Sequence, residues 1–326
     1  MDIVPELSPF FRGPQHLVHK PDSPEAFLLD VGSPVRQSFT YATELPEGHP
    51  LFGDMAAPFH DLLFPVEALR HAALFAARQY FRVPPQRITA VSASGTEITD
   101  VAPWRRSDGP ALIALELALT PVNVITGVPR GLECEATVSI GGRRCGTAGA
   151  ELVFLSPGVH RGHREAGRRQ SEQSLLAGCG QIPVSGVPAP EHVGRRSARN
   201  VLVGLPVEGD DERLVFPVDL EAAGQVLGDE VPAALFLEAS RQAALMAAAE
   251  LHGFIPSHAL LTRWHGAFRG FAEPALPLRC AVRAEKPDAR GAVRNAAGSP
   301  TARLRLEFLQ GDREVAQVSA SVLQDC

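Results

Sequence analysis

A pattern of small, apolar and charged residues occurs twice along the chain of 326 residues. Residues 67–78 read EALRHAALFAAR and residues 238–249 read EASRQAALMAAA, which agree at eight of twelve positions with an offset of 171 (238 − 67). Two further anchors recur in the same order, with offsets of 175 and 170: VHK at 18–20 with VGR at 193–195, and IGGR at 140–143 with QGDR at 310–313. Three anchors whose offsets differ by only five residues indicate a duplicated domain.

Each copy predicts the same succession of elements. A short strand is followed by a loop, one long alanine-rich helix, and several strands that end at a glycine-containing hairpin turn. The predicted late strands cover residues 111–119, 132–140 and 145–155 in the first copy, and 278–284, 302–309 and 314–323 in the second. This order is typical of an α+β unit in which an antiparallel sheet packs on a single helix.

The two predicted helices carry alanine on nearly every side. Side chains this small let a sheet approach closely, so we expect each helix to be wrapped by its sheet. A helix wrapped by a curled antiparallel sheet is the hot-dog architecture, and two copies predict a tandem, or double, hot-dog fold. We expect a first repeat at residues 1–160, a Gly/Arg/Ser-rich linker at 161–190, and a second repeat at 191–326.

Composition excludes several classes of protein. There are 31 basic and 37 acidic side chains, a formal charge of −6, so no nucleic-acid partner is expected. The five cysteines are odd in number, irregularly spaced and without a CxxC pair, which favours a reducing cytoplasm over a disulfide framework or zinc site. The start of the chain lacks a signal-peptide pattern, and no run of about 18 apolar residues occurs. We therefore predict a cytoplasmic protein with no membrane partner, no metal and no cofactor.

Each predicted helix carries one polar pair on its apolar surface: Glu67 with Arg70, and Glu238 with Arg241. Residues at i and i+3 share a helix face. A lone buried charge costs several kcal/mol, so each pair is either mutually compensated or faces a cavity that holds a polar ligand. A structural ion pair between helix and sheet is the alternative to a catalytic role, and the presence of both pairs does not decide between them, because duplication copies either.

Two histidines and two aspartates precede the first helix, and they favour a site there. His49, Asp54, His60 and Asp61 lead into the helix that carries Glu67, and a helix N-terminus attracts anions. These residue types are suited to general acid–base catalysis and to binding of a phosphate or an oxyanion. We predict the four as substrate-binding residues, although capping of backbone groups is the commoner role of any single loop histidine. The corresponding second loop, residues 220–231, has no histidine, so we expect the two clefts to differ.

The chain resembles the A-factor biosynthesis hot-dog family. The resemblance covers residues 18–155 and 193–325, and it rests on the VHK and VGR anchors, HPLFGD at 49–54, HDLL at 60–63, VEALRHA at 66–72 and VPAALFLEASRQA at 231–243. It implies synthesis of γ-butyrolactone or related signals that control antibiotic production and secondary metabolism, a form of quorum signalling. The implied enzyme is an acyltransferase that moves a β-ketoacyl group from acyl carrier protein to dihydroxyacetone phosphate. Its implied catalytic residues are Glu67, Arg70, Glu238 and Arg241, with a glutamate as general base and an arginine on the phosphate or oxyanion.

One departure keeps other functions open. The family usually has DHVPG in the second half, where this chain has Glu230 in place of histidine and Ala233 in place of glycine. A hot-dog thioesterase or dehydratase acting on acyl thioesters, and a non-catalytic ligand-binding homologue, are the alternative functions. A homo-oligomer is possible for each of these functions.

Overall fold

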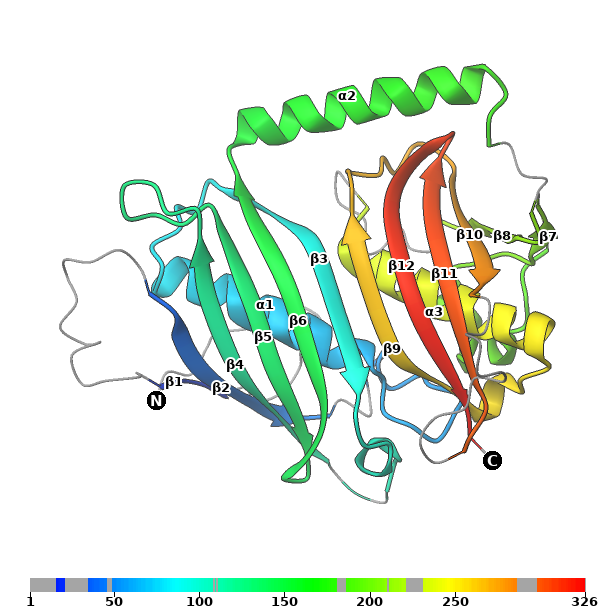
Figure 1. Cartoon of the computed structure of the whole chain (residues 1–326), viewed down its shortest axis with the longest axis horizontal. Helices are drawn as coiled ribbons and strands as arrows, with labels where there is room; N and C mark the ends of the chain where they lie inside the picture. The colour runs from blue at the N-terminus through cyan, green and yellow to red at the C-terminus, as the bar shows by residue number, and fades with distance from the viewer. Residues whose placement is uncertain are drawn as a thin grey trace. The chain divides into compact units, whose positions relative to one another are not determined.

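Each half of the sequence forms an antiparallel sheet with one long helix against it in the computed structural model, which describes residues 16–20, 35–45, 49–107, 109, 111–180, 186–209, 211–220, 231–285 and 298–325 (Figure 1). The chain divides into two compact units, Met1–Gly53 with His60–His160, and Asp54–Phe59 with Arg161–Cys326. A short piece of the first half, residues 54–59, thus belongs to the second unit.

The first unit consists of a sheet of six strands and helix α1 (Leu63–Gln79). Every neighbouring pair in this sheet is antiparallel. In spatial order the strands are β1 (His16–Lys20), β2 (Gln37–Glu44), β4 (Leu112–Val122), β5 (Gly131–Ile140), β6 (Arg143–Leu155) and β3 (Ile88–Ile98). A short 3-10 helix, η2 (Ala102–Trp104), follows β3.

The second unit repeats this plan with helix α3 (Ala233–His252). Its strands are, in spatial order, β9 (Ala259–Phe268), β12 (Arg313–Gln324), β11 (Thr301–Gln310), β10 (Leu278–Ala284), β8 (Leu214–Val218) and β7 (Val207–Glu208). Its 3-10 helices are η3 (Pro190–Val193), η4 (Ala198–Asn200) and η5 (Pro256–His258). When the second sheet is read from β7, its hairpin strands β11 and β12 take the same positions as β5 and β6 in the first sheet read from β1, so the duplication inferred from sequence is visible in the topology.

Alanines fill the contact between each helix and its sheet. The small side chains of α1 at positions 68, 72, 73, 76 and 77 have no exposed surface, and those of α3 at 239, 243, 244, 247 and 248 likewise have none. The strands alternate, so that one side buries residues such as Leu115 and Leu306 against the helix while the other side carries polar residues. The predicted tandem hot-dog α+β fold is confirmed.

A helix occupies most of the segment predicted as a linker. Helix α2 (Pro157–Leu176) is bound to the second unit by polar contacts: Arg164 donates to both oxygens of Glu273 at 3.0 and 2.8 Å, and Arg313 Nε donates to Ser171 Oγ at 2.9 Å. Because the buried residues of α2 are serines rather than an apolar stripe, hydrophobic periodicity did not reveal the helix.

Other differences from the predicted elements are local. Strands β2, β3, β7, β8 and β9 were not predicted. The VGR anchor at 193–195 covers the end of η3, followed by Gly194 in the left-handed region. The second-copy loop with Asp229 and Glu230 lies outside the described residues.

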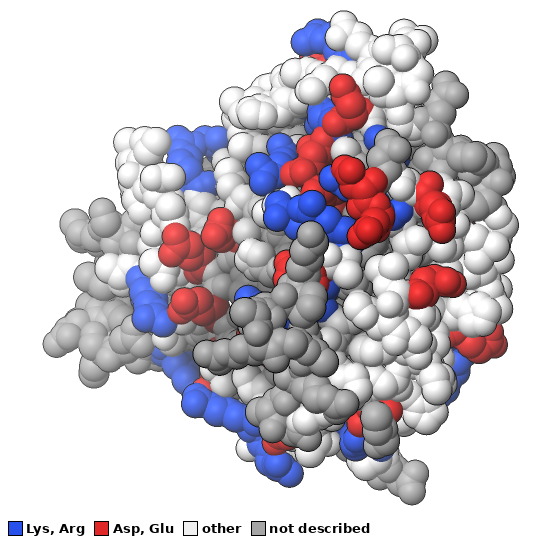
Figure 2. Space-filling view, turned by 45° about the vertical axis from the view of Figure 1, so that its right-hand side comes forward, with Lys and Arg blue, Asp and Glu red and all other residues white. Residues whose placement is uncertain are grey.

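Two surface properties bear on partners. None of the described helices is long and apolar enough to cross a membrane. Figure 2 shows acidic and basic side chains interspersed on one side of the molecule, as a small net charge leads us to expect.

Candidate functional site

Helix α1 carries Glu67 and Arg70 in direct contact. Glu67 is 6% exposed, and its Oε2 accepts hydrogen bonds from Arg70 Nε at 3.1 Å and from Nη2 at 2.9 Å. The Arg70 side chain is 28% exposed, so part of its guanidinium is accessible to solvent. The predicted pair therefore exists, and it is only half enclosed.

The same arginine binds His71, a residue that sequence analysis missed. Arg70 Nη2 lies 2.9 Å from His71 Nε2. Since a guanidinium donates hydrogen bonds and never accepts them, Nε2 is the acceptor and carries no proton in this arrangement. The repeat contained a signal for this residue. The offset of 171 aligns His71 with Gln242 (242 − 71), so a polar residue follows the arginine in both copies.

The second oxygen of Glu67 is left open. Among the described residues, Glu67 Oε1 has no hydrogen-bond partner although it is buried. Buried carboxylate oxygens are almost always hydrogen-bonded, and an unsatisfied one costs about 1–3 kcal/mol. An unsatisfied oxygen on a carboxylate held by an arginine is able to accept a proton or a hydrogen bond from a ligand.

Three residues before α1 take part in hydrogen bonds to backbone groups. Asp61 Oδ1 accepts the Leu63 N–H at 3.0 Å and so satisfies one of the free donors at the helix start. His49 Nδ1 accepts the N–H groups of residues 51 and 52, both at 3.1 Å, and the His60 N–H donates to the Trp104 carbonyl at 2.8 Å. These contacts are capping and turn contacts, and a substrate-binding role for these residues stays a prediction.

Asp54 lies in the second unit, away from the group in which we expected it. Its Oδ2 accepts hydrogen bonds from Asn200 Nδ2 at 2.6 Å and from the Ser197 N–H at 3.2 Å. Its neighbour Met55 forms an isolated bridge with Arg195. Asp54 therefore anchors the 54–59 segment to the 195–200 loop.

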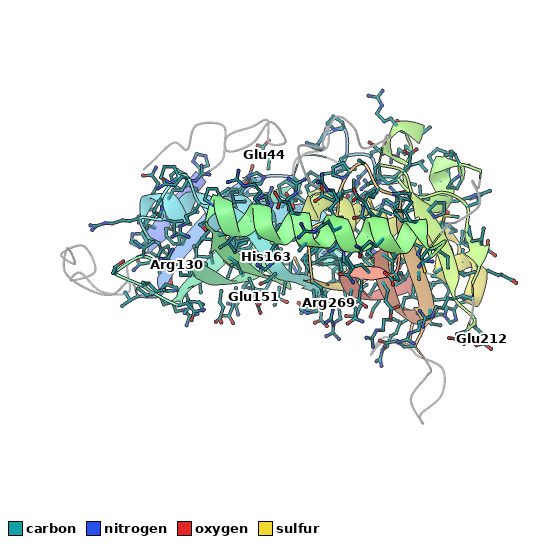
Figure 3. The ribbon with its side chains drawn as sticks, turned by 90° about the horizontal axis from the view of Figure 1, so that it is seen from above. Glu44, Arg130, Glu151, His163, Glu212 and Arg269 are labelled. Carbon is teal, nitrogen blue, oxygen red and sulfur yellow. The ribbon has the colours of Figure 1, made fainter. Side chains whose placement is uncertain are left out.

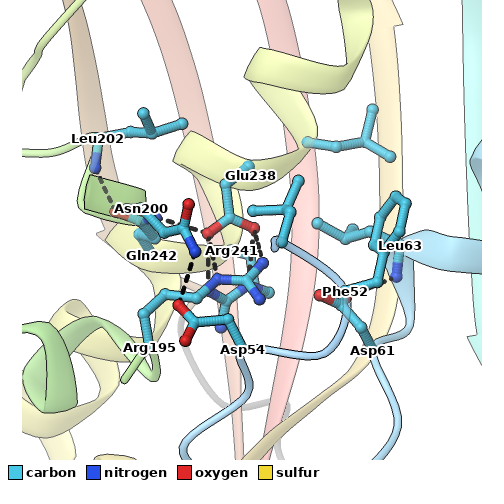
Figure 4. Close-up of polar contacts among 12 residues, drawn as sticks. Phe52, Asp54, Asp61, Leu63, Arg195, Asn200, Leu202, Glu238, Arg241 and Gln242 are labelled. Atoms are coloured by element: carbon cyan, nitrogen blue, oxygen red, sulfur yellow. Dashed lines mark hydrogen bonds and ion pairs between the residues drawn. The ribbon is translucent and has the colours of Figure 1, made fainter. Parts of the chain in front are cut away.

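Glu238 on α3 sits at the centre of a buried polar cluster (Figure 4). Arg195 donates to both of its oxygens, from Nε at 2.9 Å and Nη2 at 2.5 Å. Arg241 also donates to both, from Nε at 3.0 Å and Nη2 at 2.7 Å, and Gln242 Nε2 adds a bond at 2.5 Å. The four residues are at most 1% exposed, so this predicted pair is enclosed in protein.

Opposing effects act on the pKa of Glu238. Burial raises it, but the charges of Arg195 and Arg241 and their hydrogen bonds outweigh burial and lower the pKa to about 2. Glu238 is thus ionised at neutral pH, with both oxygens occupied by donors.

The VGR anchor at 193–195 creates this enclosure. Gly194 has φ +70°, which favours glycine, and a Cβ there would lie 2.7 Å from Leu245 Cδ1 and 2.9 Å from Arg241 Nη1, so a side chain at this position would force these groups to shift. Gln242 links the cluster to the 200–202 backbone, because its Oε1 accepts the Leu202 N–H at 2.8 Å and its Nε2 donates to the Asn200 carbonyl at 2.6 Å. No cluster that could hold a metal ion occurs among the described residues.

Known proteins match both halves of the chain. A family model for the A-factor biosynthesis hotdog domain matches residues 10–156 and 187–323. The 2-oxo-3-(phosphooxy)propyl 3-oxoalkanoate synthase of Streptomyces coelicolor is 26% identical over 244 residues, which is 75% of this chain and 74% of the relative. A protein of the same name from Streptomyces griseus is 27% identical over 263 residues, or 76% of this chain and 79% of the relative.

Solved structures are more distant. An oleoyl thioesterase (putative) from Lactobacillus plantarum has a TM-score of 0.49 at 10% identity, and covers 89% of this chain and 97% of that one. The dehydratase domain of RzxB from Pseudomonas fluorescens has a TM-score of 0.46 at 11% identity, with coverages of 88% and 94%. Neither likeness bears on the chemistry of this chain.

Proposed function

The chain belongs to the A-factor biosynthesis hotdog family, and we propose that it transfers a 3-oxoacyl group from an acyl carrier protein thioester to a hydroxyl of dihydroxyacetone phosphate. The name shared by the Streptomyces relatives describes an ester of a 3-oxoalkanoate with a phosphorylated 2-oxopropyl group, which is the product of this reaction. In the proposal the ester is a cytoplasmic precursor of a γ-butyrolactone-type signal that controls secondary metabolism.

The open oxygen of Glu67 carries the proposal. Both glutamates are buried on equivalent helices, yet Glu238 receives five hydrogen bonds from described side chains whereas Glu67 Oε1 receives none. A general base needs an oxygen within hydrogen-bond reach of the proton it removes. Of these two glutamates, only Glu67 offers such an oxygen among the described contacts, so we assign the chemistry to Glu67.

In the proposed reaction the proton moves through Glu67. The acceptor hydroxyl donates to Oε1 and loses its proton as its oxygen attacks the thioester carbon. The tetrahedral intermediate then expels the thiolate, the C–S bond breaks, and the thiolate takes the proton from Glu67 to give the free thiol and the new ester.

Arg70 supplies the positive charge in this scheme. Its Nη2 is held by Glu67 and His71, which fixes the plane of the guanidinium while part of the side chain stays exposed. A fixed fork of donors is suited to a phosphate or to the developing oxyanion. His71 acts through Arg70, as a positioning residue.

In this proposal Glu238 and Arg241 have a structural role, although the sequence suggested a catalytic one. Their mutual bonds, with Arg195 and Gln242, leave no carboxylate oxygen for a reactant. We propose that this cluster holds α3 and the 193–203 segment in place and supports catalysis only through the fold.

The test is a reconstituted transfer assay with mass detection of the product. The wild-type chain is incubated with 3-oxoacyl carrier protein, with and without dihydroxyacetone phosphate. Glu67→Gln is expected to lower kcat by about 10²–10⁴-fold with an unchanged melting temperature. Glu116→Gln, on the exposed side of β4, is the matched control and is expected to keep full activity.

Two outcomes would overturn the proposal. Release of free 3-oxo acid at the same rate with or without the triose phosphate would identify a thioesterase. An effect of Glu67→Gln on melting temperature but not on turnover would assign Glu67 a structural role, as would full activity of that variant.

A further inference from the structure

The outer side of the second sheet, which faces away from α3, is basic. Arg263 on β9, Arg283 on β10, and Arg303 and Arg305 on β11 point to this side, together with His265. Glu307 on β11 also lies on this side, where it pairs with Arg305 and Arg213. Cross-strand registers place Arg283 directly opposite Arg305. In the described part of the chain, Arg263, Arg283 and Arg303 take part in no ion pair.

The outer side of the first sheet is acidic. Glu97 on β3, Glu116 on β4, Glu133 and Glu135 on β5, and Glu151 on β6 all face away from α1. Figure 3 shows Glu151 on this side of the sheet. The register of β5 and β6 places Glu133 directly opposite Glu151, and neither has an ion pair among the described residues.

Equivalent positions of the two copies carry opposite charges. The hairpin anchors fix the offset of this region at 170, which aligns Glu133 with Arg303 (303 − 133) and Glu135 with Arg305 (305 − 135). The copies share their strand order, so these positions occupy the same place on β5 and β11. The duplicated sheets have therefore diverged into one acidic and one basic face.

Like charges opposite one another weaken a sheet. Such cross-strand pairs are destabilising by a few tenths of a kcal/mol to about 1 kcal/mol each, and each face carries one. A partner face of opposite charge would offset both penalties, because glutamates without an ion pair, such as Glu133 and Glu151, would lie near arginines of the other face. We infer that the acidic face of one copy of this chain binds the basic face of another copy.

A second copy fits these faces better than the acyl donor does. The sheet separates the basic face from α3, so a carrier protein seated there would hold its acyl group on the wrong side of the sheet. Five strands of about eight residues cover about 24 by 26 Å. This area of about 600 Å² per partner is below the standard interface of about 800 Å², so the association is weak and driven by charge.

Salt dependence is the first test, by analytical ultracentrifugation of the wild-type chain. At about 20 mM NaCl we expect association beyond the monomer, and at about 300 mM a dissociation constant at least about tenfold higher, because added salt screens exposed charges. The head-to-tail contact uses two different faces, so further copies are able to add at low salt.

Charge exchange between the faces is the decisive test. Arg303→Glu/Arg305→Glu leaves a chain with two acidic faces, and Glu133→Arg/Glu135→Arg leaves one with two basic faces. Each variant alone is expected to stay monomeric at low salt, and an equimolar mixture is expected to associate. Arg161→Glu/Arg169→Glu, on the exposed side of α2, changes the net charge equally and is expected to associate like wild type.

The inference is overturned by a wild-type chain that stays monomeric at low salt at every attainable concentration. It is also overturned if association persists in either face variant alone, or if the mixed variants do not associate. Binding of acyl carrier protein to the wild-type basic face without self-association would assign this face to that partner instead. The substituted residues are exposed except for Arg305, which is half-buried, and melting temperatures within a few degrees of wild type show that the variants fold.

Discussion

Replacement of Glu238 by glutamine removes the one negative charge from a cluster that contains two buried arginines. Arg195 and Arg241 are at most 1% exposed, and both direct their bonds to this carboxylate. Glutamine has nearly the same shape but is neutral, so the variant tests charge rather than packing. Arg195 and Arg241 would keep their charges in a site that solvent does not reach.

The loss of stability expected for Glu238→Gln can be worked out from the structure in two ways. Removal of one partner from a buried ion pair costs about 3–5 kcal/mol, because the remaining charge is uncompensated. Independently, a carboxyl whose pKa falls from 4.5 to about 2 on folding contributes about 3 kcal/mol, at about 1.4 kcal/mol per pH unit. We therefore expect Glu238→Gln to lower the free energy of unfolding by about 3–5 kcal/mol at neutral pH.

The pH dependence has a definite sign. The folded pKa of Glu238 is lower than the unfolded one, so this contribution is present above pH 4.5 and is lost as the pH falls toward 2. Wild-type protein should lose about 3 kcal/mol more than Glu238→Gln across that window. At neutral pH the variant should show a urea midpoint lower by about 1–2 M.

Tryptophan fluorescence is a suitable readout. Trp264 Nε1 donates to Ser240 Oγ at 2.6 Å, so this indole contacts α3 two residues from Glu238. Glu67→Gln is the control, because Arg70 is partly exposed and able to recover solvation, and its cost should be about 1 kcal/mol or less. Equal urea midpoints for wild type and Glu238→Gln, or equal losses of stability between pH 4.5 and 2, would refute this account of the cluster.

Substitutions at three further positions separate positioning from scaffolding. His71→Gln keeps an acceptor for its arginine neighbour and should retain turnover within about tenfold, whereas His71→Leu should lower kcat more than it raises KM at an unchanged melting temperature; equal kinetics for both variants would contradict the positioning role. Gly194→Ala places a Cβ 2.9 Å from Arg241 Nη1 at φ +70°, so calorimetry should show a melting temperature lower by about 3–10 °C, from a cost of about 1–3 kcal/mol. Arg164→Ala removes both bonds to Glu273 and should speed proteolytic cleavage of α2, while an unchanged rate would show that its other contacts suffice to hold the helix.

The duplicated fold was predictable because its signals are local and repeated. Alanine-rich helices at α1 and α3, and alternating strands at β5, β6, β11 and β12, each show their own periodicity. Helix α2 was not predictable in this way, since it has no apolar stripe and docks through Arg164 and Ser171. Contacts that join distant segments have no periodic signature in a single sequence.

The two Glu–Arg pairs of the candidate site were predictable from the sequence, but the residues that bind them were not. The spacing of Glu67 and Arg70 correctly indicated a shared helix face. It did not show that Arg195, 43 residues before Glu238, would close the second cluster, or that Asp54 would join Asn200 146 positions later. Such long-range bonds depend on loop paths, which hydrophobic patterning does not specify.

The two clusters are versions of one arrangement, and the differences between them locate the chemistry. A glutamate and an arginine at i and i+3 occur in both, but the next residue is Gln242 in one and His71 in the other. Gln242 binds backbone at Asn200 and so ties α3 to a loop, whereas His71 binds Arg70. The second copy adds a further arginine that occupies its carboxylate, and the first copy leaves an oxygen open. If the duplicated pairs began with one function, the fully bonded carboxylate of Glu238 leaves Glu67 as the carboxylate that a reactant is able to bind, and stability and turnover should therefore respond to different glutamates.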